Sequence, residues 1–309
     1  MAWRGLHLTK PSRLSLADGQ IIIRQDDDEV RLALEDIAWI VVDTPQAQLS
    51  SALLSACMES GIVMILTDAQ HLPNGMVLPF HRHFRQADVA RLQTEISAPL
   101  RKRLWQVIVQ RKIENQAGVL TTTGRSGAGV LVEMAKRVGS GDPDNVEARA
   151  ARHYWGNLFD SFIRDDETDR RNMLLNYGYA VMRAGVARAL VAYGFLPALG
   201  LFHASVSNAF NLADDIIEPF RPFVDILADK LARDSSSEKN ILTIDDRRQM
   251  AGVLLGDARL GSTKHSETVS LLVATERAAA SLARAMETGS AAVLELPLLV
   301  PSVLVPDES

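Results

Sequence analysis

The pattern of hydrophobic and polar positions changes near residue 86. Before it, apolar residues occur in short runs, such as 37–42 and 62–66, which are typical of buried β-strands. Asp18-Gly19, placed between two apolar-rich runs, predicts a β-hairpin. Residues 50–61 indicate a short helix closed by a glycine. The segment "LPNGMVLP" at 72–79, with two prolines and an Asn-Gly pair, predicts a turn or linker.

Beyond residue 86 the apolar residues recur at helical spacing. Over 100–120, the spacing of Leu104, Ile108, Ile113 and Leu120 follows a helical period. The same kind of pattern predicts further helices over 145–163, 170–194, 224–234 and 275–287. The sequence therefore predicts an α+β protein with a small β-rich domain at residues 1–85, which includes a linker, and a larger all-α domain at 86–309.

Composition adds an expected location. The chain of 309 residues contains no run of about 20 apolar residues, so we expect no membrane-spanning helix. Its first ten residues lack the apolar core of a signal peptide. Its single cysteine, Cys57, cannot form an internal disulfide. These features favour a cytoplasmic protein.

Charge is unevenly distributed along the chain. The net charge is −5, but residues 81–200 contain 18 Lys and Arg against 12 Asp and Glu, which makes this middle segment basic. A basic region on an acidic chain is typical of a local phosphate-binding face. The alternative is that solvent-exposed helix surfaces are simply rich in arginine.

An acidic cluster follows the basic segment. Asp214, Asp215 and Glu218 lie within five positions in apolar surroundings, with no Lys or Arg among or directly before them. In a helix at least two of these acids share a face, because Glu218 follows the others by three and four positions, and carboxylates this close raise at least one pKa or require a cation. Because Pro219 disfavours helical geometry at Glu218, we expect the helix to end or kink there and to leave Glu218 at an exposed edge.

These acids have a candidate nitrogen partner upstream in His203. One or two carboxylates with an imidazole are a ligand set suited to Mn²⁺ or Mg²⁺. The alternative is a solvent-exposed acidic helix end with a surface histidine, although acids at a helix C-terminus oppose the helix dipole. Glu147 is a candidate for a third carboxylate. Since Asp144 and Glu147 also have the spacing of a capping box, both interpretations of Glu147 stay open here.

Several segments together resemble one protein family. "NAFNLADDIIEPFRPFVD" at 208–225 resembles the metal-binding helix of the CRISPR-associated adaptation integrases, and "VEARAARHYWGNLF" at 146–159 is similar to their glutamate helix. "LRKRLWQVIVQRKIENQ" at 100–116 looks like their first long helix, and 172–203 looks like the central helix that leads to the metal histidine. The resemblance covers nearly the whole chain, and 214–225 looks most like type II CRISPR systems.

The resemblance implies a metal-dependent DNA endonuclease and integrase that inserts new spacers into a CRISPR array. Its metal triad corresponds here to Glu147, His203 and Glu218, which would be both metal ligands and catalytic residues, with Mg²⁺ or Mn²⁺ as the ion. Asp215 corresponds to a further acid near the metal, and Asp214 is adjacent to it. The reaction would be attack of a DNA 3′-hydroxyl, or of water, on a phosphodiester. A metal-binding imidazole must be neutral, so activity should fall in mild acid.

In this interpretation the basic segment would contact DNA phosphates. Neutralising DNA phosphates needs Lys and Arg but no base-specific contact. The candidates lie on the first long helix and on the glutamate helix. They are Arg101, Lys102, Arg103, Arg111, Lys112, Arg149 and Arg152. For any one of them, a solvated surface role stays an alternative.

The resemblance also implies partners. The family binds double-stranded DNA, both the incoming fragment and the CRISPR array, and forms homodimers through its β domains. It assembles with a small ferredoxin-like subunit and, in type II systems, with the effector and accessory proteins. No membrane partner is expected.

Two other functions fit part of the sequence. "DDIIE" at 214–218 matches the aspartate-rich motif of all-α isoprenoid synthases, which bind Mg²⁺ and a diphosphate. We find no second metal motif of those enzymes, and the β-rich first domain has no place in that fold. A non-catalytic helical scaffold of a DNA-bound complex would show the same pattern apart from a broken triad, and here the triad is intact.

Overall fold

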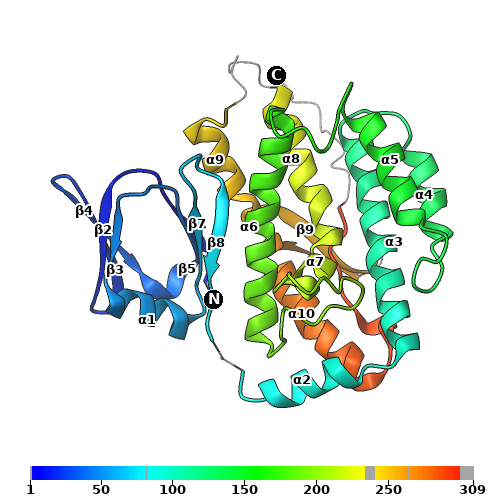
Figure 1. The fold of residues 1–309 in the computed structure, drawn as a ribbon, viewed down its shortest axis with the longest axis horizontal. Helices are drawn as coiled ribbons and strands as arrows, with labels where there is room; N and C mark the ends of the chain where they lie inside the picture. The colour runs from blue at the N-terminus through cyan, green and yellow to red at the C-terminus, as the bar shows by residue number, and fades with distance from the viewer. Residues whose placement is uncertain (1, 81–82, 234–240, 263–264, 300–309) are drawn as a thin grey trace.

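The structure is a computed structural model, and it describes residues 2–80, 83–233, 241–262 and 265–299. A β-rich N-terminal part lies beside a larger, mostly helical part (Figure 1). The predicted α+β class is therefore confirmed. In the described part of the chain, every helix is too short or too polar to cross a lipid bilayer.

The N-terminal part contains two four-stranded sheets and one helix. In the first sheet, two parallel pairs and one antiparallel pair give the order β1(Arg4–Leu8), β5(Ile37–Val42), β7(Val63–Thr67), β8(Pro73–Val77). The second sheet has the order β4(Asp28–Ala33), β3(Gln20–Gln25), β2(Ser12–Ala17), β6(Ala47–Leu49). The helix α1(Ser51–Ser60) and the short 3-10 helix η1(Leu34–Asp36) complete this part.

Two local sequence patterns in this part correctly predicted a hairpin turn and a helix end. Asp18 and Gly19 join β2 to β3 with φ of 50° and 71°, which is the backbone that a two-residue hairpin requires. The predicted hairpin is thus confirmed. Helix α1 starts at the Ser50 cap, whose side chain accepts a hydrogen bond from the Leu53 amide. It ends at Gly61 with φ of 68°, as predicted.

The prediction of a turn or linker at 72–79 is wrong for most of that segment. Residues Pro73–Val77 form β8, an edge strand that runs antiparallel to β7, with Gly75 opposite Leu66. Proline is tolerated at the first residue of an edge strand, where it removes no ladder hydrogen bond. The turn lies just before the strand, where His71 has a φ of 62°.

Helices dominate the rest of the chain. They are α2(Gln86–Glu95), α3(Ala98–Thr122), α4(Ala128–Lys136), α5(Val146–Leu158), α6(Arg170–Ala192), α7(Asn211–Ile216), α8(Arg221–Arg233), α9(Ile244–Ala251) and α10(Leu271–Thr288), with the 3-10 helices η2(Glu218–Phe220), η3(Val253–Leu255) and η4(Ala291–Val293). Helix α6 has the strands of the N-terminal part on one side, and α3, α4 and α5 lie on its other side, beyond α8 (Figure 1). Its buried length explains its strongly apolar sequence.

A two-stranded hairpin was not predicted in this part. The strands β9(Asp257–Ser262) and β10(His265–Ser270) pair antiparallel. In β9 the buried Ala258 and Leu260 alternate with an exposed Arg259, which is the period of a half-buried strand. Because this run is short, its alternation does not stand out from the helical pattern on either side of it.

The two parts are joined by buried contacts of β5 and of Asp43, the residue that follows it. On one face Trp39 is packed among the helices, and its indole N–H donates a hydrogen bond to the Ala251 carbonyl at 3.0 Å. At the end of the strand the buried Asp43 carboxylate accepts a hydrogen bond from Arg247 Nε at 2.8 Å. Asp43 is also bonded to His7 and His71 of the N-terminal part. The position of the helical part is therefore tied to the sheet by specific polar bonds.

Candidate active site

Glu147 lies in the first turn of α5, with its side chain directed at another helix. The carboxylate of Asp142 accepts hydrogen bonds from the amides of Val146 and Glu147 at 2.8 and 2.9 Å, so Asp142 satisfies the start of the helix. The capping-box interpretation of Asp144 and Glu147 is therefore wrong. The side chain of Glu147 instead forms an ion pair with Lys112 of α3.

Glu218 begins the short helix η2, between α7 and α8. The predicted interruption at Pro219 is confirmed, because α7 ends at Ile216 and α8 starts at Arg221. The expected exposed edge is wrong, since Glu218 is only 6% exposed. Burial can be tolerated because Arg221 Nε donates to Glu218 Oε1 at 2.8 Å and Lys112 pairs with Oε2. The structure thus turns a predicted surface acid into a buried and paired one.

The pKa of Glu218 follows from these partners. Burial alone would raise it, but the nearby charges of Arg221 and Lys112, with their hydrogen bonds, lower the pKa to about 2. Crowding with neighbouring acids was expected to raise a carboxyl pKa or require a cation. The chain supplies the cations itself, from α3 and from the start of α8.

Lys112 is the residue that joins the two glutamates. Its ammonium lies within ion-pair distance of Glu147 Oε1 and of Glu218 Oε2, and the contact with Oε2 is off the hydrogen-bonding direction. The prediction of Lys112 as a DNA contact is wrong, because its side chain is buried and paired with both glutamates. The helical spacing contained this signal: Lys112 comes four residues after the buried Ile108, on the inward face of α3.

His203 is held by Asp215. The buried Asp215 carboxylate is bonded to His203 Nδ1 at 2.7 Å and also accepts hydrogen bonds from the backbone amides of Leu201, Phe202 and His203. The hydrogen bond to Asp215 is the main cause that raises the pKa of His203, and the charge of Glu218 adds to the effect. With Nδ1 bound, the nitrogen that can face a metal is Nε2. Asp215 is therefore a positioning residue for His203.

Asp214 points to a different partner. Its carboxylate forms an ion pair with Arg183 of α6, at 2.6 Å from Nε and 2.8 Å from Nη2. It also accepts a hydrogen bond from the Asn208 amide at 2.6 Å. The three clustered acids therefore have different partners: Asp214 pairs with Arg183, Asp215 with His203, and Glu218 with Arg221 and Lys112. This explains how the chain tolerates them in apolar surroundings.

The ligand set for a divalent ion is only partly gathered in this conformation. No group of three or more His, Cys, Asp or Glu among the described residues lies close enough together to hold a metal ion. Glu147 and Glu218 nevertheless reach a single cation, the Lys112 ammonium, and Asp215 orients His203 in the manner of a metal-binding histidine. The donor chemistry therefore fits Mg²⁺ or Mn²⁺, while the triad itself stays a prediction.

Comparison with known proteins decides the family. The sequence model of the family described as CRISPR associated protein Cas1 matches residues 6–262. This chain belongs to the Cas1 family. It is 45% identical over 227 residues to a CRISPR-associated endonuclease Cas1 of Neisseria meningitidis serogroup C, covering 73% of this chain and 75% of that protein. The predicted resemblance is confirmed, and the isoprenoid synthase alternative is excluded.

Solved structures share the fold. A casposase bound to an integration product superposes with a TM-score of 0.75 at 18% identity, over 93% of this chain and 91% of that one. A chain of a Cas6-RT-Cas1–Cas2 complex superposes with a TM-score of 0.72 at 17% identity, over 97% of this chain and 36% of that one. At these identities the likeness concerns the Cas1 fold alone.

The remaining basic candidates of this Cas1-family chain lie on the surface of α3 and α5. Arg101, Lys102 and Arg103 are exposed in the first turns of α3, and Arg149 and Arg152 are exposed on α5. Arg111 is half-buried and pairs with Glu114 at 3.1 Å. Their exposure leaves them able to contact phosphates, but whether they do so stays a prediction.

Sequence reasoning missed an aromatic surface beside His203. Phe202 is 56% exposed and stacks on Trp105 of α3, with ring centroids 4.3 Å apart and the planes nearly parallel. Both residues line a cleft of about 310 Å³ together with Arg101, Lys102 and His203. Positive charge and an aromatic face in one cleft suit a nucleotide. The signal was the two aromatic residues, which lie far apart in sequence and meet only in the fold.

A buried acid behind the site was also missed. Asp225 of α8 accepts a hydrogen bond from Tyr154 at 2.8 Å and another from Tyr179. Burial raises its pKa to about 6, although the two hydroxyl donors oppose the shift. Arg221, which holds Glu218, lies over the Tyr179 ring at 4.6 Å. The glutamate is thus supported by a connected polar network.

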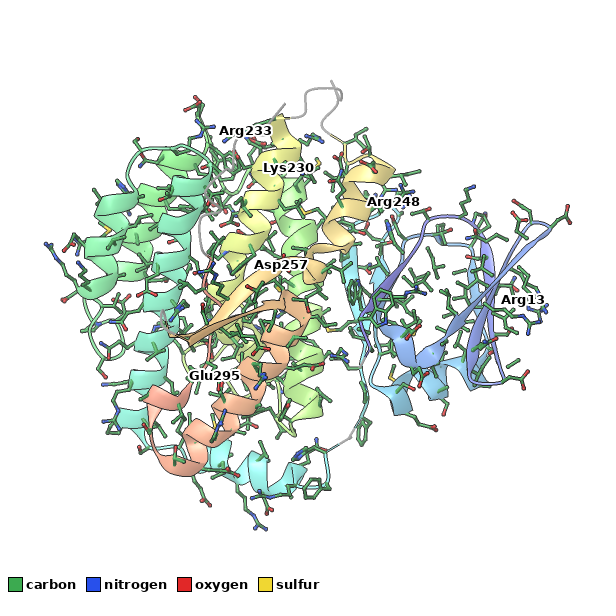
Figure 2. All side chains as sticks on the ribbon, turned by 180° about the vertical axis from the view of Figure 1, so that it is seen from behind. Arg13, Lys230, Arg233, Arg248, Asp257 and Glu295 are labelled. Atoms are coloured by element: carbon green, nitrogen blue, oxygen red, sulfur yellow. The ribbon has the colours of Figure 1, made fainter. Side chains whose placement is uncertain are left out.

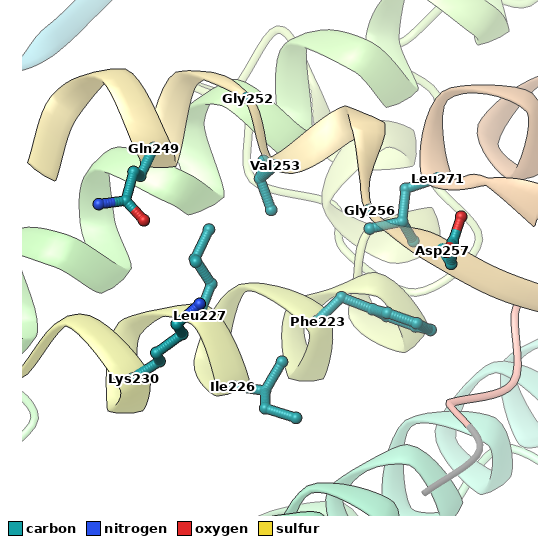
Figure 3. Close-up of a pocket in the computed structure, with 10 residues that line it drawn as sticks. All are labelled: Phe223, Ile226, Leu227, Lys230, Gln249, Gly252, Val253, Gly256, Asp257 and Leu271. Atoms are coloured by element: carbon teal, nitrogen blue, oxygen red, sulfur yellow. The ribbon is translucent and has the colours of Figure 1, made fainter. Parts of the chain in front are cut away.

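A second, apolar cleft lies elsewhere in the helical part. It has a volume of about 450 Å³ between α8, α9 and the start of α10, and Phe223, Leu227 and Leu271 contribute to its walls (Figure 3). Lys230 and Asp257 are the charged residues that line it. Lys230, with Arg233 and Arg248, also adds positive charge on the neighbouring helices α8 and α9 (Figure 2). None of the predicted site residues lines this cleft.

Proposed function

We propose that this chain is a divalent-metal-dependent DNA endonuclease and integrase of CRISPR adaptation. It would insert new spacers by attack of a 3′-hydroxyl on a DNA phosphodiester at the repeat. The observation that carries the proposal is the convergence of Glu147 and Glu218 on one cation, in a chain of the Cas1 family. A relative named as an endonuclease, and a fold shared with a casposase bound to an integration product, support it.

Glu147, Glu218 and the Nε2 nitrogen of His203 would hold Mg²⁺ or Mn²⁺. When bound, the ion supplies a Lewis acid that stabilises negative charge on the phosphoryl and leaving oxygens. Asp215 keeps the imidazole in the orientation and tautomer that a metal needs. Arg221 fixes one oxygen of Glu218, so that the carboxylate cannot rotate freely.

The DNA would be held by charge and by stacking. Arg101 and Lys102 line the cleft that contains Phe202 and His203, and the exposed Arg103 follows them on α3, so phosphates bound there would be close to His203. Arg149 and Arg152 share α5 with Glu147 and extend the positive surface. Because these contacts are to phosphates, binding should depend on salt more than on sequence.

Partners follow from the family. We propose double-stranded DNA, a homodimer formed through the N-terminal β-rich part, and assembly with a small ferredoxin-like adaptation subunit. Solved relatives include a complex that contains Cas2 as well as Cas1. The segment 214–225 supports a type II assignment, with the effector and accessory proteins as further partners. A cytoplasmic location suits these partners.

The test is strand cleavage and joining by the purified protein with Mn²⁺ and a branched DNA substrate. Glu218→Gln and Glu147→Gln remove one ligand each and should abolish both reactions. Glu133→Gln, on the exposed face of α4, removes an acid of the same kind and should leave them intact. Equal activity in all four proteins would reject the metal site, and binding of DNA without any reaction would favour the non-catalytic scaffold.

A further inference from the structure

Lys112 is unusual because its charged ammonium lies in a buried position. It projects from the buried face of α3, is 8% exposed, and has apolar neighbours along its own helix. An ammonium placed in such surroundings is costly unless it is paired. Here it is paired twice, with a glutamate from α5 and a glutamate from η2.

The two acids are divided between cations in a specific way. Arg221 binds Glu218 Oε1, and Lys112 contacts Glu218 Oε2 and Glu147 Oε1. The oxygens that face Lys112 are those through which one divalent ion could bind both carboxylates. The ammonium and the ion cannot contact the same oxygens together. Lysine is suited to leave, because its compact charge sits on a flexible four-carbon chain, whereas Arg221 follows Glu218 by only three residues.

We propose that Lys112 is an internal placeholder cation, which holds Glu147 and Glu218 together without a divalent ion and is displaced when the ion binds. This inference rests on the proposed metal site and goes beyond it. In this role Lys112 lets the protein fold with the buried Glu218 and the half-buried Glu147 already in ligand position. It also makes metal affinity weaker than the ligands alone would give, because the ion must compete with a bound charge.

The experiment measures Mn²⁺ affinity by titration calorimetry and the melting temperature in EDTA, without DNA. Lys112→Met keeps the length and apolar stem and removes the charge. Lys136→Met, on the exposed face of α4, is the matched control. We expect Lys112→Met to bind Mn²⁺ about tenfold more tightly or better, since a competing charge at contact distance is gone. In EDTA its melting temperature should fall by about 5 °C or more, because the buried Glu218 and the half-buried Glu147 lose a partner.

A variant that folds only when Mn²⁺ is present would also support displacement, because the ion then replaces the lost ammonium. Unchanged or weaker Mn²⁺ affinity in Lys112→Met would overturn the inference, as would failure of both Lys112→Met and Lys112→Gln to fold with or without Mn²⁺. If wild type and variants all fold but none binds Mn²⁺, the proposed metal site fails and the placeholder role fails with it. Mn²⁺ binding by the wild type therefore separates failure of the placeholder role alone from failure of the metal site itself.

Discussion

Asp215 binds His203 Nδ1 at 2.7 Å, and the same carboxylate accepts hydrogen bonds from three successive backbone amides that include the one of His203. One buried acid therefore fixes both the loop and the imidazole that it presents. The second ring nitrogen, Nε2, is then the one available to a metal or a substrate. The chain achieves this with residues that lie twelve positions apart.

Replacing Asp215 with Asn should weaken metal binding without removing a proposed ligand. The amide keeps the size of the side chain but loses the charge that favours the imidazole orientation, and loss of such a partner typically costs about 10–100-fold in metal affinity or activity. Mn²⁺ titration of Asp215→Asn, beside Asp144→Asn on the exposed loop before α5, checks this. Equal Mn²⁺ affinity in Asp215→Asn and wild type would show that Asp215 does not position a ligand.

Metal binding should weaken in mild acid. The hydrogen bond that His203 Nδ1 donates to the Asp215 carboxylate raises the pKa of His203 above its ordinary value of 6.5. The bond to Asp215 therefore stabilises the fold fully below about pH 6.5, and this contribution is lost as pH rises through the folded-state pKa. A metal needs the neutral imidazole, so Mn²⁺ affinity should increase through a midpoint above 6.5. Affinity measured from pH 5.5 to 8.5 tests this, and the midpoint should move down in Asp215→Asn. A flat profile would remove His203 from the ligand set.

Removing Arg221 should destabilise the protein and alter its acid sensitivity. Glu218 is buried, and its pKa of about 2 depends on Arg221 and Lys112. Because the folded-state pKa is lowered, the pairing contributes stability above pH 4.5 and loses it as pH falls toward 2. Arg221→Met should lose about 3–5 kcal/mol at pH 7, as other broken buried pairs do. Urea unfolding measures the loss of unfolding free energy in Arg221→Met and in the control Arg91→Met, which changes an exposed arginine. Equal losses in the two variants would contradict the role of Arg221 as the partner of Glu218.

Regular elements could be predicted from the sequence because their causes are local. The helical period located α3 and α6, and the Asp18-Gly19 pair located the first hairpin. The strand β8 was missed, because Pro73 and Asn74-Gly75 are turn signals by themselves and form an edge strand only when β7 is beside them. The hairpin of β9 and β10 was missed because the alternation of buried and exposed residues in β9 is short.

The sequence predicted which acids belong to the candidate site, but not how they lie relative to one another. Glu147 and Glu218 are far apart in the chain, and only the packing of α5 and η2 against α3 brings both to Lys112. Glu218 was expected to be exposed because Pro219 interrupts the helix there. Its burial depends on Arg221, three residues later, and on Lys112 of α3, while Asp214 pairs with Arg183 of α6, and both Lys112 and Arg183 are distant in sequence from the acids. The buried position of Lys112 could be predicted from its spacing to Ile108, but its pairing with Glu147 and Glu218 could not.

Substituting the exposed basic residues should weaken DNA binding without changing sequence preference. Arg101→Gln and Arg149→Gln each remove one positive charge near the proposed site. Removal of one phosphate contact should reduce the slope of log affinity against log salt by about 0.9. The control is Arg13→Gln, an exposed arginine of β2 in the N-terminal part (Figure 2). Fluorescence anisotropy with two unrelated duplexes at several salt concentrations measures both effects. A slope unchanged from wild type would place these two residues outside the DNA interface.

Breaking the bond between the two parts should uncouple them. The Arg247 side chain is 9% exposed, and it donates to the fully buried Asp43. Burial would raise the pKa of Asp43, but its bonds to His7, Arg247 and His71 outweigh burial and lower it. Arg247→Met leaves that charge under-compensated and should cost about 3–5 kcal/mol of unfolding free energy. Arg248→Met changes the next residue, which is exposed, and should cost less than about 0.5 kcal/mol.

The same pair of variants distinguishes global from local damage. Because Asp43 and Arg247 lie on opposite sides of the boundary between sheet and helices, Arg247→Met should split a single urea transition into two, with the N-terminal part and the helical part unfolding separately. Tryptophan fluorescence follows this, since the buried Trp39 donates to Ala251 across the same boundary. One transition shifted equally in both variants would mean that the Asp43–Arg247 bond does not hold the two parts together.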